Sequence, residues 1–135
     1  MLKYPGAYLI IFLTLVVIDM LWLRVIAVSW YERGMGSLLA ESPNLWAAAA
    51  FYLLYPLGLL IFAVYLPDAG TASVLKVAVL GALFGFFAYA TYDLTALAVI
   101  KNWPLGLSLV DMAWGACVSG IASAAGKFGL DYFSR

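Results

Sequence analysis

The chain has 135 residues, of which 67% are hydrophobic and 10% charged, and its seven Lys and Arg residues balance its seven Asp and Glu residues. A typical soluble domain is about half apolar and about one quarter charged, so this composition excludes a water-soluble protein. A membrane-spanning helix needs about 20 mainly apolar residues. We therefore predict an all-α integral membrane protein, a bundle of four transmembrane helices, with residues 1–135 forming a single membrane domain.

The residue types exclude several kinds of partner and cofactor. The formal net charge is zero and no segment is dense in Lys or Arg, so nucleic acid is not an expected partner. Cys117 is the only cysteine and the chain has no histidine. An internal disulfide and the usual Cys and His zinc sites are therefore excluded, and we expect no metal ion and no cofactor.

Four apolar segments predict the four spans. In chain order they cover about residues 7–28, 45–66, 73–100 and 105–126. Each is long enough to cross the hydrocarbon core of a bilayer, which needs about 20 residues. The connections between them are short, so neighbouring spans run in opposite directions.

Polar residues mark the three connections. The longest runs from Tyr31 to Asn44, and Asn44 is expected to cap the second span. The segment Pro67-Asp68-Ala69-Gly70 predicts a turn, and Lys101-Asn102-Trp103-Pro104 predicts another, with Pro104 suited to the first turn of the last helix. We call the end that holds both termini and the Pro67–Gly70 turn side A, and the opposite end side B.

The basic residues indicate the orientation in the membrane. Cytoplasmic loops carry an excess of Lys and Arg. Side A holds four such residues and side B holds three: Lys3, Lys76, Lys127 and Arg135 against Arg24, Arg33 and Lys101. This small excess favours both termini in the cytoplasm.

Small residues recur on the last two spans at a spacing that allows close helix packing. Gly81 and Gly85 form a G-x-x-x-G pattern, and a looser series follows on the fourth span at Gly115, Ser119, Ala122 and Gly126. Such series let helix backbones approach each other in lipid. We interpret them as a packing seam.

Three carboxylates lie inside the predicted spans. An ionisable group there costs at least about 2.5–3.5 kcal/mol on insertion scales. At a rise of about 1.5 Å per residue, Asp19, Asp93 and Asp111 lie about 13, 10 and 9 Å inside the side-B ends of their spans. All three are therefore expected in one layer near side B.

Aromatic and hydroxyl side chains accompany these acids. The string Asp-Met-x-Trp occurs twice, and in each copy the tryptophan lies at i+3, on the same helix face as the aspartate. The run from Tyr89 to Thr95 is unusually polar for a spanning segment. We predict a binding pocket formed by Asp19, Trp22, Tyr52, Tyr55, Tyr89, Tyr92, Asp93, Thr95, Asp111 and Trp114.

A purely structural role for these polar groups is the competing interpretation. They could bond one another, with some aspartates neutral, and so fasten the bundle. Hydrogen bonds between spanning helices contribute only about 0.6 kcal/mol on average, which does not offset the insertion cost of three acids. Intramembrane acids otherwise mark substrate or ion paths, so the pocket is the favoured interpretation.

Several of these motifs resemble a known family. They are Asp19 with Trp22, Pro43-Asn44, the run from Phe51 to Tyr55, the run from Phe87 to Thr95, Trp103-Pro104, and Asp111 with Trp114-Gly115. Together they resemble the small bacterial membrane proteins grouped as domain of unknown function 2177. The resemblance covers nearly the whole chain and implies a membrane fold in the bacterial inner membrane. It implies no activity.

Three functions fit these observations. The first is binding or processing of an amphiphilic, lipid-like molecule, with membrane lipid as the partner. The second is a proton-coupled transporter of small solutes that acts as a homodimer, by general resemblance to small multidrug-resistance proteins. The third is a non-catalytic partner in a larger membrane complex. Paired carboxylates suit acid–base catalysis, but the sequence has no nucleophile elbow, metal cluster or phosphate loop, so enzymatic activity stays open.

Overall fold

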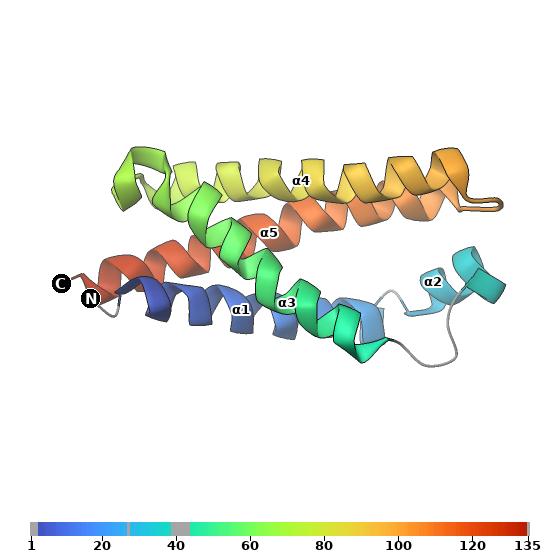
Figure 1. Ribbon diagram of the computed structural model, residues 1–135, viewed down its shortest axis with the longest axis horizontal. Coiled ribbons are helices and arrows are strands. Elements are labelled where there is room, and N and C mark those ends of the chain that lie inside the picture. Colours follow the sequence, from blue (N-terminus) through green and yellow to red (C-terminus); the bar gives the residue numbers. More distant parts are fainter. Residues whose placement is uncertain (1–2, 27, 39–43, 135) are drawn as a thin grey trace.

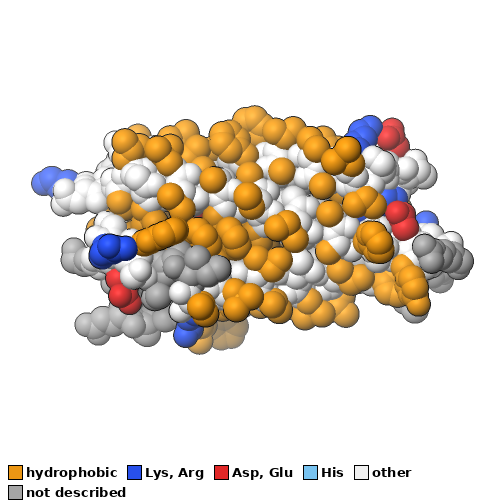
Figure 2. Space-filling view, turned by 180° about the vertical axis from the view of Figure 1, so that it is seen from behind, with side chains coloured by type: hydrophobic (Ala, Val, Ile, Leu, Met, Phe, Trp, Pro, Cys, Tyr) orange, Lys and Arg blue, Asp and Glu red, His pale blue; other side chains and the backbone are white. Residues whose placement is uncertain are grey.

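The computed structural model describes residues 3–26, 28–38 and 44–134. Within this part of the chain there is no β-strand, and four helices are long and apolar enough to cross a membrane: Lys3–Val25, Leu45–Tyr65, Val74–Val99 and Leu105–Phe133. In Figure 2, charged side chains gather toward the two ends of the molecule and hydrophobic ones cover the surface between them. The predicted all-α membrane protein with four transmembrane helices is confirmed.

The first span consists of α1 (Lys3–Leu21) and a π-helical continuation, Trp22–Ile26. A short helix that the sequence did not predict follows on side B, α2 (Val28–Met35), and a 3₁₀ turn, Gly36–Leu38, comes after it. Part of the expected long connection is therefore helical. Residues 39–43 of that connection, with Pro43, lie outside the described residues.

The second span consists of α3 (Leu45–Leu59) and a π-helical end, Leu60–Tyr65. The Asn44 side chain accepts a hydrogen bond from the backbone N–H of Ala47 at 3.2 Å, which confirms the predicted cap. Pro56 lies inside α3, where it cannot donate the usual helical bond to Tyr52. The helix changes to the wider π form four residues later.

The second span crosses the bundle diagonally (Figure 1). Its π-helical end packs against α4 (Val74–Val99), whereas α3 itself packs mainly against α1. The span therefore lies close to α4 at side A and moves away from it toward side B. Toward side B, residues of both helices line a cavity.

The most extensive helix contact joins α4 to α5 (Leu105–Phe133). Gly81, Gly85, Gly115 and Ser119 of the predicted seam lie in this contact, whereas Gly126 packs against Ile11 of α1. A Cβ atom added at Gly85 would collide with the backbone oxygen of Gly115 and the side chain of Ser119. Glycine at this position therefore sets how closely the two helices pack.

A buried lysine fastens the bundle at side A. Lys127 is only 3% exposed, and its ammonium group donates to the backbone oxygen of Gly70 at 2.8 Å and to Asp131 at 2.6 Å. The positive charge of Lys127 is thus paired with Asp131 on the same helix, α5. This helix continues to Phe133, past the predicted end at residue 126. Both termini lie at this end of the molecule (Figure 1).

Candidate functional site

The first acid of the site is Asp19, near the side-B end of α1. It is buried, with 6% of its surface exposed. One carboxylate oxygen accepts a hydrogen bond from the Tyr52 hydroxyl of α3, and the other accepts one from the indole N–H of Trp114 on α5 at 3.0 Å. Asp19 therefore joins three of the four spans.

The second acid, Asp111 on α5, is held by the short helix α2. The Tyr31 hydroxyl donates to Asp111 at 2.7 Å and accepts a bond from the indole N–H of Trp22 at 3.2 Å. Burial raises the pKa of Tyr31 above its ordinary range, and the hydrogen bond to Asp111 raises it further. Tyr31 therefore stays neutral and acts as a donor at physiological pH.

Two stacked indoles connect the surroundings of these two acids. The rings of Trp22 and Trp114 lie 4.4 Å apart between centroids and are nearly parallel, at 8°. Offset or parallel aromatic pairs of this kind contribute about 0.5–1.5 kcal/mol beyond their burial. The stack fixes the direction of both N–H groups, and so the positions of their acceptors.

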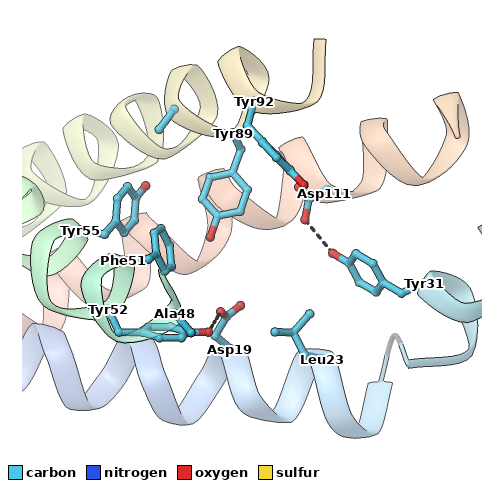
Figure 3. A pocket seen from close by; sticks show the side chains of 11 residues that line it. Asp19, Leu23, Tyr31, Ala48, Phe51, Tyr52, Tyr55, Tyr89, Tyr92 and Asp111 are labelled. Carbon is cyan, nitrogen blue, oxygen red and sulfur yellow. Dashed lines mark hydrogen bonds between the residues drawn. The ribbon is translucent and has the colours of Figure 1, made fainter. Parts of the chain in front are cut away.

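A cavity of about 520 Å³ lies between the two acids. It is framed by all four spans and α2, and Figure 3 shows the aspartates and tyrosines turned toward it. Its lining residues are Asp19, Leu23, Tyr31, Ala48, Phe51, Tyr52, Tyr55, Ala88, Tyr89, Tyr92 and Asp111. We call this the main cavity. Its size falls within the range of about 300–1,000 Å³ typical of small-molecule sites.

A glycine and a serine of α5 hold two of the tyrosines that line the main cavity in place. A Cβ atom added at Gly115 would fall against the ring of Tyr89, so only glycine leaves room for that ring. Tyr55 shares a hydrogen bond of 2.6 Å with the Ser119 hydroxyl, and its ring meets that of Tyr89 edge-on. These contacts fix both tyrosines at the cavity wall.

The third acid, Asp93 on α4, lies in a separate small cavity of about 30 Å³. It is 2% exposed, and its Oδ2 atom has no hydrogen-bond partner among the described residues; the same is true of the buried indole N–H of Trp103 beside it. The volume is about that of one water molecule. Asp111 borders both cavities and is within hydrogen-bonding reach of Asp93, so a bond between them requires a proton on one carboxyl group.

The ten predicted pocket residues fall into four groups in the structure. Six of them line the main cavity: Asp19, Tyr52, Tyr55, Tyr89, Tyr92 and Asp111. Trp22 and Trp114 do not line it, but Trp22 donates a hydrogen bond to Tyr31 and Trp114 donates one to Asp19. Asp93 borders the small cavity. Thr95 is exposed, and its hydroxyl bonds backbone oxygens of Thr91 and Tyr92, so it contributes no contact to either cavity.

Sequence reasoning missed five lining residues of the main cavity. They are Leu23, Tyr31, Ala48, Phe51 and Ala88. Tyr31 is the one with a polar role, and it stands in the segment predicted as a connection. The combination Trp30-Tyr31-Glu32-Arg33, aromatic and charged together, is the available signal for an interfacial helix there.

Comparison with known proteins gives a family for this chain. The family model described as "Predicted membrane protein (DUF2177)" matches residues 4–128. The chain belongs to this family. The match covers α2 and most of each of the four spans, and it confirms the resemblance found in the sequence. No curated protein and no solved structure matches the chain.

The site offers carboxylates, phenols and indoles for chemistry. Within the described ranges, no group of three or more His, Cys, Asp or Glu side chains could hold a metal ion. Asp19 and Asp111 are acceptors held by neutral donors, and Asp93 and Asp111 form a neighbouring carboxyl pair. The arrangement can therefore hold a polar group between two acids and exchange protons through the carboxyl pair.

Proposed function

We propose that this family member binds an amphiphilic, lipid-like molecule, whose polar end lies between Asp19 and Asp111 in the main cavity. The observation that carries the proposal is the cavity itself, which places two carboxylates among aromatic side chains at membrane depth. Buried acids are costly in this environment and mark functional sites by default. A pocket that is mostly apolar with a few fixed polar groups is typical of ligand sites.

The apolar part of the amphiphile leaves the main cavity between α3 and α4. Phe51 on α3 and Tyr92 on α4 both line the main cavity, and yet they are 37% and 56% exposed. In a spanning bundle, such exposure at this depth means contact with lipid. An acyl chain can therefore extend from the cavity into the side-B leaflet while its polar end stays inside.

Binding and processing are separate parts of this proposal. The neighbouring carboxyl groups of Asp93 and Asp111 supply the proton donor and acceptor that acid–base catalysis uses. A proton-coupled transporter that works as a homodimer would use the same pair, and a partner in a larger membrane complex would not need it. Release of a proton when the ligand binds would support the transporter, and its absence would support a non-catalytic partner in a complex.

The proposal places the protein in the bacterial inner membrane with both termini in the cytoplasm. The position of both termini at side A and the small excess of Lys and Arg there support this orientation. Reporter fusions test it. A C-terminal alkaline phosphatase should be inactive and a C-terminal fluorescent protein active; the reverse result would overturn the orientation.

Copurified lipid is the direct test of binding. Purified protein should carry an amphiphile that mass spectrometry detects, and Ala48→Trp should displace it because Ala48 lines the main cavity. Ala49→Trp is the matched control, since Ala49 is the next residue of α3, is exposed and does not line the cavity. Equal lipid content in both variants, with unchanged melting, would contradict the proposal.

A further inference from the structure

We infer that the polar end of the bound amphiphile is an ammonium group, held between Asp19 and Asp111. This inference rests on the proposed function and names the ligand class for the same cavity. It follows from the charge of the lining residues, from the rings around them and from the position of the basic residues elsewhere in the chain.

The main cavity is lined by two acids and, among the described residues, by no basic side chain. Two of its lining residues are carboxylates, and none of those described is Lys, Arg or His. The donors that hold them, Tyr52, Trp114 and Tyr31, are neutral. Neutral donors do not cancel a negative charge, and an unpaired charge away from water is costly. A cationic ligand supplies the missing countercharge.

The basic residues of the chain are held elsewhere. Lys127 and Lys76 pair with Asp131 and Asp68 at side A, the opposite end from the site. Arg24, Arg33 and Lys101 are exposed on side B, and Arg33 donates to the backbone of its own helix. None of these five residues lines the main cavity.

The aromatic rings that line the main cavity also suit an ammonium group. The rings of Tyr31, Phe51, Tyr52, Tyr55, Tyr89 and Tyr92 line it. Phe51 meets Tyr52 at 69°, and Tyr55 meets Tyr89 at 67°, so the lining presents rings in several orientations. Aromatic rings attract ammonium ions through cation–π interactions, and cages of such rings bind quaternary ammonium groups.

The same features disfavour an anionic headgroup. A headgroup whose only charge is a phosphate or sulfate ester would lie beside two carboxylates without a basic side chain among the described lining residues to pair with it, and like charges repel strongly in a low-dielectric setting. The ammonium group could belong to a zwitterionic lipid headgroup or to a free cationic amphiphile. Both sources share the chemistry that the cavity recognises.

Three probes of equal alkyl chain length test the inference. Protein in neutral maltoside micelles is mixed with an alkyltrimethylammonium and an alkyl sulfate, and native mass spectrometry measures the complexes, with the maltoside as the uncharged reference. Ala48→Trp gives the background from binding outside the cavity. We expect the ammonium complex to exceed the sulfate complex by about tenfold or more, as a cation–π site in a desolvated setting allows.

Acid-removing variants assign the preference to the two aspartates. Asp19→Asn and Asp111→Asn should each reduce the ammonium preference severalfold, whereas Asp68→Asn, an exposed acid at side A, should leave it unchanged. Phosphatidylethanolamine in the mixture identifies the source. Its binding supports a lipid headgroup, and binding of the alkyltrimethylammonium alone supports a free cationic amphiphile; either supports the ammonium inference.

Two outcomes separate this inference from the proposed function. Equal ammonium and sulfate complexes that Ala48→Trp removes would overturn the ammonium inference and leave amphiphile binding in place. Complexes that Ala48→Trp does not reduce would overturn both. The comparison of probes on the unaltered protein decides the inference even if an aspartate variant fails to fold.

Discussion

Asp19 on α1 takes its indole hydrogen bond from Trp114 on α5, at 3.0 Å, although Trp22 lies only three residues away on its own span. Trp22 donates instead to Tyr31, which donates to Asp111. The two Asp-Met-x-Trp strings thus exchange their tryptophans across neighbouring helices that run in opposite directions. Sequence spacing alone suggests a donor on the same helix, whereas in the structure the two indoles stack on each other and bond across the helices.

Loss of the Trp114 hydrogen bond should destabilise the bundle. In Trp114→Phe the ring can still stack on Trp22, but Asp19 loses its indole donor. Hydrogen bonds to charged groups contribute about 1.5–3 kcal/mol, so we expect a loss of stability of that size in detergent unfolding. Trp46→Phe is the control, because Trp46 is 89% exposed; an equal effect of both substitutions would contradict this role.

Tyr31 should make the protein sensitive to alkaline pH. Burial and the bond to Asp111 raise the pKa of Tyr31 above its ordinary value of 10.0. The unfolded chain therefore loses this proton first, and the stability that Tyr31 contributes is present below pH 10 and falls as the pH rises further. The melting temperature should drop more steeply above pH 10 in the wild type than in Tyr31→Phe. Parallel curves would show that Tyr31 does not cause the sensitivity.

The overall fold could be predicted because hydrophobic length decides it. Each span exceeds the thickness of the bilayer core, and local signals such as the Asn44 cap and the glycine seam on Gly81 and Gly85 act within a few residues or along one helix face. The same regular helical rise predicts that the three acids lie near one another, and Asp111 does share one cavity with Asp19 and another with Asp93. These features need no knowledge of which helix touches which.

The details of the site could not be predicted because they depend on packing between distant segments. Residues of α3 line the main cavity where this helix crosses the bundle diagonally, and nothing in its periodicity specifies a crossing angle. Tyr31 reaches Asp111, which lies 80 positions later in the chain, only because α2 folds back over the end of α5. Asp93 has the most polar sequence neighbours, but it lies outside the main cavity.

The seam between α4 and α5 should not tolerate a methyl group. In Gly85→Ala the new Cβ would meet backbone of Gly115, which cannot move aside as a flexible side chain can. Overpacking of this kind costs about 1–3 kcal/mol, and we expect a loss of that size in the free energy of unfolding. Gly106→Ala on α5 is the matched control, since a Cβ there meets nothing within 4 Å. Equal stabilities would contradict the seam.

The buried lysine of side A should matter more than the exposed one. Lys127→Met removes the donor of the partly buried Gly70 oxygen, and a polar group left unpaired costs up to about 1–3 kcal/mol. Lys76→Met breaks an ion pair whose side chains are 51% and 57% exposed, and such pairs contribute about 0–1 kcal/mol. The loss in the free energy of unfolding in detergent should therefore be larger for Lys127→Met than for Lys76→Met. The opposite order would show that the Lys127 contacts do not fasten the bundle.

Asp93→Asn should abolish function while the bundle stays folded. The asparagine has nearly the same shape, and it can replace a protonated carboxyl group beside Asp111 and keep a hydrogen bond to it. It cannot ionise or pass on a proton at any pH. If Asp93 only fastens helices, stability and function should both survive; if it exchanges a proton with Asp111, function should be lost alone.

The measurement for Asp93→Asn is paired, with detergent melting for the fold and genetic complementation for function. Asp68→Asn controls for the loss of one acid, because Asp68 is exposed at side A and borders neither cavity. Unchanged melting with lost function supports proton exchange through the pair. Preserved function would remove Asp93 from the mechanism and leave Asp19 and Asp111 as the acids that act. The small cavity favours the first result, because an unpaired Asp93 oxygen at 2% exposure lowers stability, and buried polar groups of this kind in a membrane protein mark functional sites.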